Sequence, residues 1–154
     1  MTLSRQRSYV RVAVIYARLA LGVAFLSGIA DRFGLYGKNV GYGNFENFVR
    51  YTAQVNAFMP AFTIRFLAWA ATVAELLLGL ALVFGLWIRW TSLASAVLLA
   101  LFGTAMAISF GFKSPLDYSV FSASAAALLL AFEAGDRSWP PFAKTVVPPR
   151  NQPM

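Results

Sequence analysis

The hydrophobic positions of this chain fall into four long runs, and polar turns separate them. The runs cover residues 12–30, 64–87, 91–110 and 118–132. A helix needs about 20 apolar residues to cross a bilayer, and the first three runs have this length. The fourth has about 15 residues and would need a thinner bilayer or interfacial anchoring. The pattern predicts an all-α integral membrane protein, a four-helix bundle.

Two of the turns are short and have distinct chemistry. Residues 85–90, "GLWIRW", join the second and third runs, and their tryptophans and arginine suit a membrane interface. Residues 111–117, "GFKSPLD", join the third and fourth runs. Their glycine and proline interrupt the helical pattern and predict a turn.

The first loop, residues 31–63, is too long to be only a connector. Its apolar positions recur at helical spacing, at Phe45, Phe48, Val49, Thr52, Val55 and Met59. Asn44 can cap the start of this segment and Pro60 marks its end. The loop therefore predicts an amphipathic interfacial helix on the outer, extracytoplasmic side.

The basic residues predict the orientation in the membrane. Seven lie on one side: Arg5, Arg7, Arg11, Arg89, Arg137, Lys144 and Arg150. Five lie on the other: Arg32, Lys38, Arg50, Arg65 and Lys113. The density of positive charge favours a multi-pass protein of the cell inner (cytoplasmic) membrane with both termini in the cytoplasm.

The composition supports this class and removes several kinds of chemistry. The chain of 154 residues is 59% hydrophobic and 12% charged, and its net charge of +7 is spread over tails and turns, which argues against nucleic-acid binding. Cysteine and histidine are both absent. Disulfide exchange, cysteine-ligated iron–sulfur clusters and histidine-ligated haem are excluded within the chain, and no metal site is predicted.

We expect one transmembrane domain over residues 1–135 and a proline-rich cytoplasmic tail over residues 136–154. The first apolar run also resembles a signal peptide. Arg18 interrupts its apolar core, and further spans follow, so we favour a retained helix.

Rows of small residues run along each predicted helix and indicate close helix packing. They are Ala20, Ala24 and Gly28; Ala71 and Gly79; Gly103, Ala107 and Gly111; and Ser119, Ala123, Ala127 and Ala131. Glu75 lies between Ala71 and Gly79, so we expect it at a helix interface rather than facing lipid.

Arg18 and Glu75 lie deep inside predicted spans. Counted from the predicted helix ends, their depths differ by roughly 7 Å, which an arginine side chain can nearly bridge. We therefore predict an intramembrane pair of Arg18 with Glu75. Such a pair either fixes helix register alone, or lets Glu75 carry a proton or bind a polar head group.

A second polar cluster is predicted where the helices end on the outer side. It consists of Asp31, Arg32, Lys113, Asp117 and Tyr118. Asp117 can also cap the fourth helix. The alternative is an outer pocket where a quinone head group or a loop of a partner protein could dock.

Three segments resemble the DoxX-like family of small four-helix membrane proteins: "ARLALGVAFLSGIADRFG", "ELLLGLALVFGLWIRW" and "GFKSPLDYSVFSASAAALLL". The resemblance covers about residues 12–133. The matching family positions are Arg18, Gly22, Gly28, Glu75, Gly85 and Arg89. Many members have a lysine soon after the glycine that matches Gly28, whereas this chain has Asp31 and Arg32.

The resemblance implies a membrane component of an oxidoreductase system, since a related subunit belongs to a thiosulfate:quinone oxidoreductase and others associate with thiol-oxidant defence proteins. The catalytic residues stay unknown, and the chain alone has no cofactor motif, but it could bind quinone or hold a redox partner. The alternative is a non-catalytic membrane scaffold or stress-response partner. A homo-oligomer is compatible with either.

Overall fold

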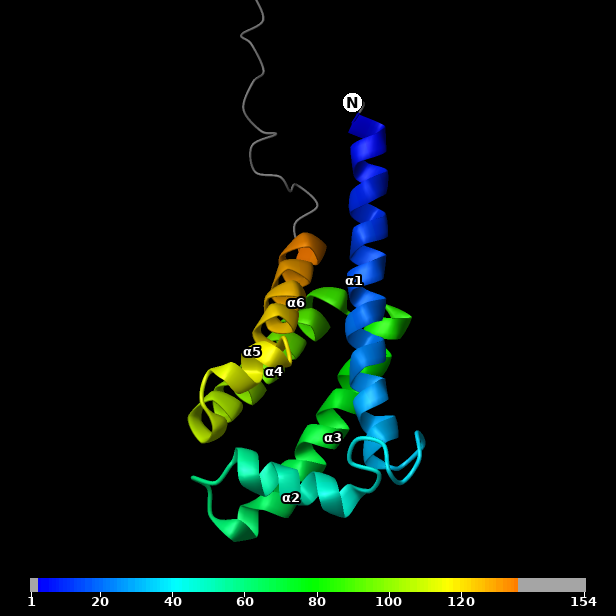
Figure 1. The fold of residues 1–154 in the computed structure, drawn as a ribbon. Helices are drawn as coiled ribbons and strands as arrows, with labels where there is room; N and C mark the ends of the chain where they lie inside the picture. The colour runs from blue at the N-terminus through cyan, green and yellow to red at the C-terminus, as the bar shows by residue number, and fades with distance from the viewer. Residues whose placement is uncertain (1–2, 136–154) are drawn as a thin grey trace, which may run out of the picture.

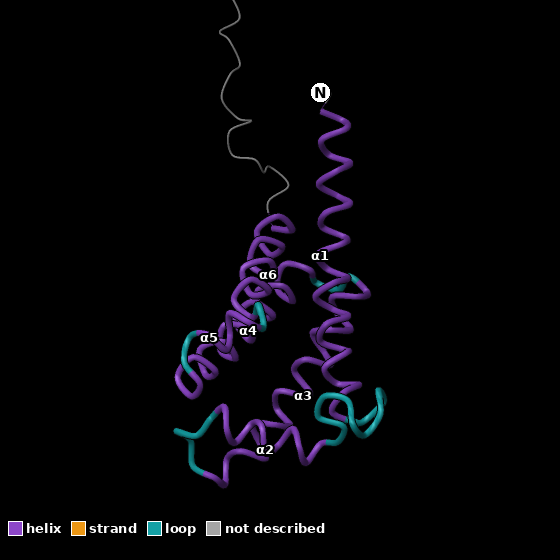
Figure 2. The backbone as a smooth tube through the Cα atoms, viewed as in Figure 1, coloured by secondary structure: helices purple, strands orange, loops and turns teal. Residues whose placement is uncertain are grey.

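The computed structural model describes residues 3–135, so the predicted tail, residues 136–154, lies outside the described part. Six helices follow one another, and the described part contains no strand. They are α1 Leu3–Arg32, α2 Phe45–Val55, α3 Ala61–Phe84, α4 Ile88–Phe110, α5 Lys113–Asp117 and α6 Val120–Gly135 (Figures 1 and 2). The chain is all-helical, as predicted.

Among the described residues, three helical segments are long and apolar enough to cross a membrane: Ser8–Arg32, Ala61–Phe84 and Ile88–Phe110. Helix α6 is apolar but shorter. The chain is therefore a multi-pass membrane protein. The N-terminal part of α1 extends well beyond the turn between α3 and α4 (Figure 1).

The long helices pack mainly as two pairs, α1 with α3 and α4 with α6. Contacts between the pairs are fewer, and in Figure 1 the pairs diverge toward the end where α2 lies. Apolar side chains join them closer to the other end, where Leu21, Phe25, Leu82, Ala127 and Leu130 share one buried cluster. The space described below lies between the two pairs.

Two glycines bring α1 and α3 into close contact. A Cβ atom on Gly22 would lie 2.8 Å from Val83 Cγ2 and 3.0 Å from the Gly79 carbonyl oxygen. A Cβ atom on Gly79 would lie 3.2 Å from the Gly22 carbonyl oxygen. The small-residue row predicted for α1 is thus partly wrong, since Ala20 and Ala24 are exposed and Gly22 makes the contact.

The α4–α6 pair is joined by a small residue on each helix and by one hydrogen bond. Gly103 of α4 accommodates the Phe121 ring, and Ala127 of α6 is fully buried. The Ser124 hydroxyl donates a 2.7 Å hydrogen bond to the carbonyl of Ala96. This pair carries one wall of the space described below.

Helix α2 lies within the first loop, across one end of the long helices (Figure 1). The Asn44 side chain accepts a hydrogen bond from the Asn47 N–H and so caps its start. The helix ends at Val55, before Pro60, and Ser109 of α4 donates a 2.6 Å hydrogen bond to the Val55 carbonyl. Its buried residues are Phe48, Thr52 and Val55, so its apolar face turns toward α1, α3 and α4.

The segment predicted as a simple turn, residues 111–117, contains the short helix α5. Pro115 is buried and lies inside α5, where its missing N–H is tolerated because the position belongs to a first helical turn. The chain then reverses at Ser119, whose φ of 54° is unusual for a residue other than glycine.

Candidate functional site

A buried ion pair joins the end of α1 to the middle of α3. Arg32 Nη2 donates to both carboxylate oxygens of Glu75, at 2.7 Å to Oε1 and 2.8 Å to Oε2. Arg32 is 6% exposed and Glu75 4%. A charge this deeply buried persists only with a partner of opposite sign, and each residue supplies that partner to the other.

Two further contacts hold the Arg32 guanidinium in place. Its Nη1 donates to the Thr72 hydroxyl at 3.1 Å, and that hydroxyl donates to the Ala68 carbonyl at 2.8 Å. The Phe48 ring of α2 covers the guanidinium, with Cζ 3.8 Å from the ring centroid. The Nε atom of Arg32 is buried and has no hydrogen-bond partner in the described part of the chain.

The position of Arg32 follows from how α1 ends. A cation in the last turn of a helix is stabilised by the helix dipole. The next-to-last residue, Asp31, accepts hydrogen bonds at 3.1 Å from the backbone N–H of Tyr42. This contact folds the glycine-rich segment back against α1. Gly34 and Gly43 meet there, both at positive φ, and any side chain would collide with backbone.

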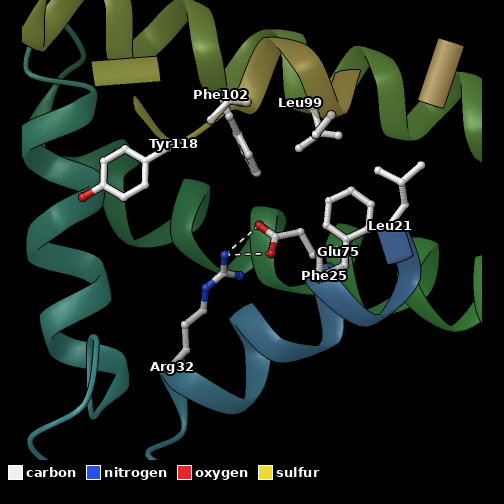
Figure 3. A pocket seen from close by; sticks show the side chains of 10 residues that line it. Leu21, Phe25, Arg32, Glu75, Leu99, Phe102 and Tyr118 are labelled. Atoms are coloured by element: carbon white, nitrogen blue, oxygen red, sulfur yellow. Dashed lines mark hydrogen bonds and ion pairs between the residues drawn. The ribbon is translucent and has the colours of Figure 1, made fainter. Parts of the chain in front are cut away.

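A cavity of about 270 Å³ opens beside the ion pair, between the two helix pairs. Its walls are mainly apolar and come from α1, α4 and α6, through Leu21, Ala24, Phe25, Leu99, Phe102, Val120 and Ala123. Arg32 and Glu75 supply its polar part, and Tyr118 completes the lining. In Figure 3 the phenylalanine rings flank the Glu75 carboxylate, while the Tyr118 hydroxyl is directed away from the pair.

The comparison with family models decides the relationship of the chain. The DoxX family model matches residues 13–109, which is more than half of the sequence. The chain belongs to the DoxX family. Searches of curated proteins and of solved structures returned no match. The family match includes Arg32, Thr72 and Glu75, whereas α5 and α6 lie beyond it.

In this DoxX chain the predicted pairing of Arg18 with Glu75 is wrong. Glu75 pairs with Arg32, and the Arg18 guanidinium lies against Gly85 at the other end of α3. Glu75 and Gly85 are ten positions apart, or about 15 Å along a helix. The prediction failed because α1 extends two residues beyond its predicted apolar run and is displaced along α3, so that Gly28, not Arg18, is level with Glu75.

The predicted outer cluster does not form one site. Arg32 and Tyr118 line the cavity, but Asp31 anchors the loop at Tyr42. Lys113 pairs with Asp117 within α5, on the exposed surface. Asp117 does not cap α6 as predicted, because its carboxylate pairs with Lys113 and accepts no hydrogen bond from a backbone N–H of α6 among the described residues.

Two contributors to the site in this DoxX chain were not identified from sequence, Thr72 and Phe48. Thr72 precedes Glu75 by three positions, and residues at this spacing share a helix face, so helical periodicity could have suggested it. Phe48 was placed on the apolar face of α2. Nothing in the sequence indicated that this face would meet an arginine rather than lipid.

The Tyr42 phenol makes the stability of the first loop sensitive to alkaline pH. Burial, with the neighbouring Tyr51, raises the pKa of Tyr42 well above its ordinary value of 10.0. Below pH 10 the phenol is neutral in both the folded and unfolded states. Above it, only the unfolded state ionises, so the free energy of unfolding should fall as pH rises further.

We expect Tyr42→Phe to reduce this loss of stability at alkaline pH. Thermal unfolding in detergent from pH 8 to pH 11 measures it. The matched control is Tyr16→Phe, because Tyr16 is exposed on α1. It should keep the wild-type profile. An identical profile for Tyr42→Phe would contradict the assignment.

Proposed function

We propose that this DoxX protein binds a quinone head group at the Arg32–Glu75 pair and acts as the membrane subunit of a quinone-linked oxidoreductase system. In this proposal α1, α3, α4 and α6 form a transmembrane four-helix bundle in the cell inner membrane, with both termini in the cytoplasm. Helix α2 caps the bundle at the outer interface.

The observation that carries the proposal is a charge pair of zero net charge facing an apolar cavity. Arg32 and Glu75 neutralise each other, so the cavity favours an uncharged ligand with hydrogen-bonding oxygens over an anionic lipid. A quinone has such a polar ring and an apolar tail. The cavity matches this division, with its polar groups beside Glu75 and apolar walls toward Leu21 and Leu99.

The depth of the pair also supports a membrane-dissolved ligand. Trp87, in the turn after α3, and Trp90, at the start of α4, are exposed and suit a membrane boundary. Glu75 lies about 15 Å from that turn along α3, which is half of a hydrocarbon core about 30 Å thick. A molecule that partitions into the bilayer could reach this level from the side.

The residues present fit a quinone carbonyl. Arg32 lines the cavity, and its guanidinium N–H groups are donors from which a carbonyl oxygen can accept. The Glu75 carboxylate has acceptor capacity beyond the two hydrogen bonds from Arg32, so it can accept from a hydroxyl. Arg32 and Glu75 thus provide one donor and one acceptor within a single fixed group, and Thr72 fixes the guanidinium.

A bound quinone would accept electrons and protons. The chain contains neither cysteine nor histidine, so we assign it binding, orientation and the exclusion of water. Electrons would come from a soluble or membrane redox protein that associates with it. Glu75 is the group best placed to exchange a proton with the ligand.

A second candidate function is a non-catalytic membrane scaffold or stress-response partner. One observation favours it: Arg32 has contacts to α2, to Thr72 and to Glu75, which together connect three helices without any ligand. On this alternative the pair only fixes the packing of α1 and α3.

A binding experiment distinguishes the two candidates. Purified protein in detergent is titrated with decylubiquinone, and binding is followed by equilibrium partition. Glu75→Gln keeps the shape of the side chain but breaks the charge pair, and we expect about tenfold weaker binding, the effect of losing one hydrogen bond to a charged group. Glu46→Gln, at an exposed glutamate of α2, is the matched control.

If wild-type protein binds no decylubiquinone, the quinone proposal fails and the scaffold is favoured. Equal binding by wild type and Glu75→Gln would show that any quinone binds elsewhere.

A further inference from the structure

Arg18 lies in a notch at the end of α3, the space left by the absent side chain of Gly85. The proposed quinone site does not use this arginine. Its guanidinium contacts Gly85, the residue that ends α3 in the left-handed conformation with φ of 76°. A Cβ atom at position 85 would occupy the space of Arg18 Nη1. Gly85 is therefore required twice, for its backbone angle and to leave room for the guanidinium.

The Arg18 guanidinium has no hydrogen-bond or ion-pair partner among residues 8–134, whose side chains the structure describes. Its Nε atom is buried. The C-terminal carbonyls of α3 favour a cation here. The two outer nitrogens, Nη1 and Nη2, also lack a partner there and are not buried, so a ligand from outside the chain can bind them.

The adjoining turn has a second unusual feature. Trp87 has φ of 41° and ψ of 47°, a left-handed conformation that is strained for a bulky residue. This strained residue is 81% exposed. Next to it, the Arg89 guanidinium lies 5.8 Å from the centre of the Trp90 ring. The turn and the start of α4 thus expose two indole rings and a cation. Exposed tryptophans of this kind are typical of the lipid head-group region.

We infer that Arg18, Gly85 and Trp87 form a binding site for the phosphate of an anionic phospholipid. The guanidinium fork offers two parallel N–H donors, the geometry that phosphate oxygens accept. The exposed indole can lie against the glycerol region, and the acyl chains can run along the apolar surface of α3. A lipid is favoured over free phosphate because the notch lies where an apolar helix surface meets an interfacial turn.

Native mass spectrometry of the full chain in detergent tests the inference, with phosphatidylglycerol and phosphatidylcholine added in turn. We expect phosphatidylglycerol to bind wild type about fivefold more tightly than phosphatidylcholine, the effect of one basic residue on an anionic lipid. Arg18→Gln should lose this preference. Arg50→Gln, at an exposed arginine of α2, is the matched control and should keep it.

Gly85→Ala provides a second variant, because the added methyl displaces the guanidinium without removing its charge. It should also weaken the preference. Circular dichroism shows whether Arg18→Gln folds. If it does not fold, the lipid preference of the wild type is the deciding measurement. A wild type that binds phosphatidylglycerol and phosphatidylcholine equally would overturn the inference. If Arg18→Gln folds and keeps the preference, the inference is also overturned. Complete displacement of phosphatidylglycerol by millimolar inorganic phosphate would overturn it too, because it would indicate a site for free phosphate.

Discussion

Arg32→Met should lower the free energy of unfolding by about 3–5 kcal/mol, because it leaves the Glu75 carboxylate buried without a partner. Methionine fills similar space, so the loss reports the charge rather than a cavity. The free energy is measured by titrating detergent-solubilised protein with a denaturing detergent and following helix content.

The matched control for this prediction is Arg50→Met, which removes an exposed arginine from α2 and should change stability little. The double variant Arg32→Met with Glu75→Leu removes both charges and should recover most of the loss, because an apolar pair of similar volume is often as stable as a buried ion pair. A small loss in Arg32→Met, or no recovery in the double variant, would show that Glu75 is not held by Arg32.

Gly22→Ala should destabilise the protein by about 2 kcal/mol, because the added methyl forces α1 and α3 apart. Its Cβ would lie 2.8 Å from Val83 Cγ2 and 3.0 Å from a backbone oxygen, and the backbone atom cannot move aside cheaply. The same unfolding titration measures the change.

Gly28→Ala is the matched control for the helix contact. It lies on the same helix, but its Cβ would be 3.5 Å from its nearest neighbour, Glu75 Oε2, an ordinary contact distance. The substitution should be neutral or slightly stabilising, because alanine favours helix over glycine by about 0.5–1 kcal/mol. Equal effects of the two substitutions would contradict the close approach of α1 and α3 at Gly22.

Features that depend on residues close together in the chain could be predicted from the sequence, whereas the pairing of residues on different helices could not. Hydropathy identified the apolar runs of α1, α3 and α4, and a single asparagine predicted the cap of α2, because these depend on residues close together in the chain. Glu75 was also predicted to lie at a helix interface, and it is buried against Gly28 and Arg32.

The partner of Glu75 could not be predicted, because it depends on how far α1 slides along α3. That register is set by the approach of Gly22 to Gly79, and a shift of a few positions exchanges one arginine for another. The ends of apolar runs are a poor measure of depth here. Arg32 was counted among the outer polar residues, yet the helix dipole and the ion pair stabilise it inside the protein.

The cavity was equally hidden from the sequence. Its walls come from α1, α3, α4 and α6, and the sequence offered an outer pocket at the polar cluster only as the alternative to helix capping by Asp117. The structure divides that cluster, because Lys113 and Asp117 satisfy each other across one turn of α5. Only Arg32 and Tyr118 reach the cavity.

The most direct test of the central claim is photoaffinity labelling with a photoreactive ubiquinone analogue in lipid nanodiscs, followed by peptide mapping. The account predicts adducts within residues 21–32, 99–102 and 118–123, which line the cavity, and predicts that excess decylubiquinone prevents them. Labels spread over the lipid-facing surfaces of the helices, unaffected by decylubiquinone, would contradict it.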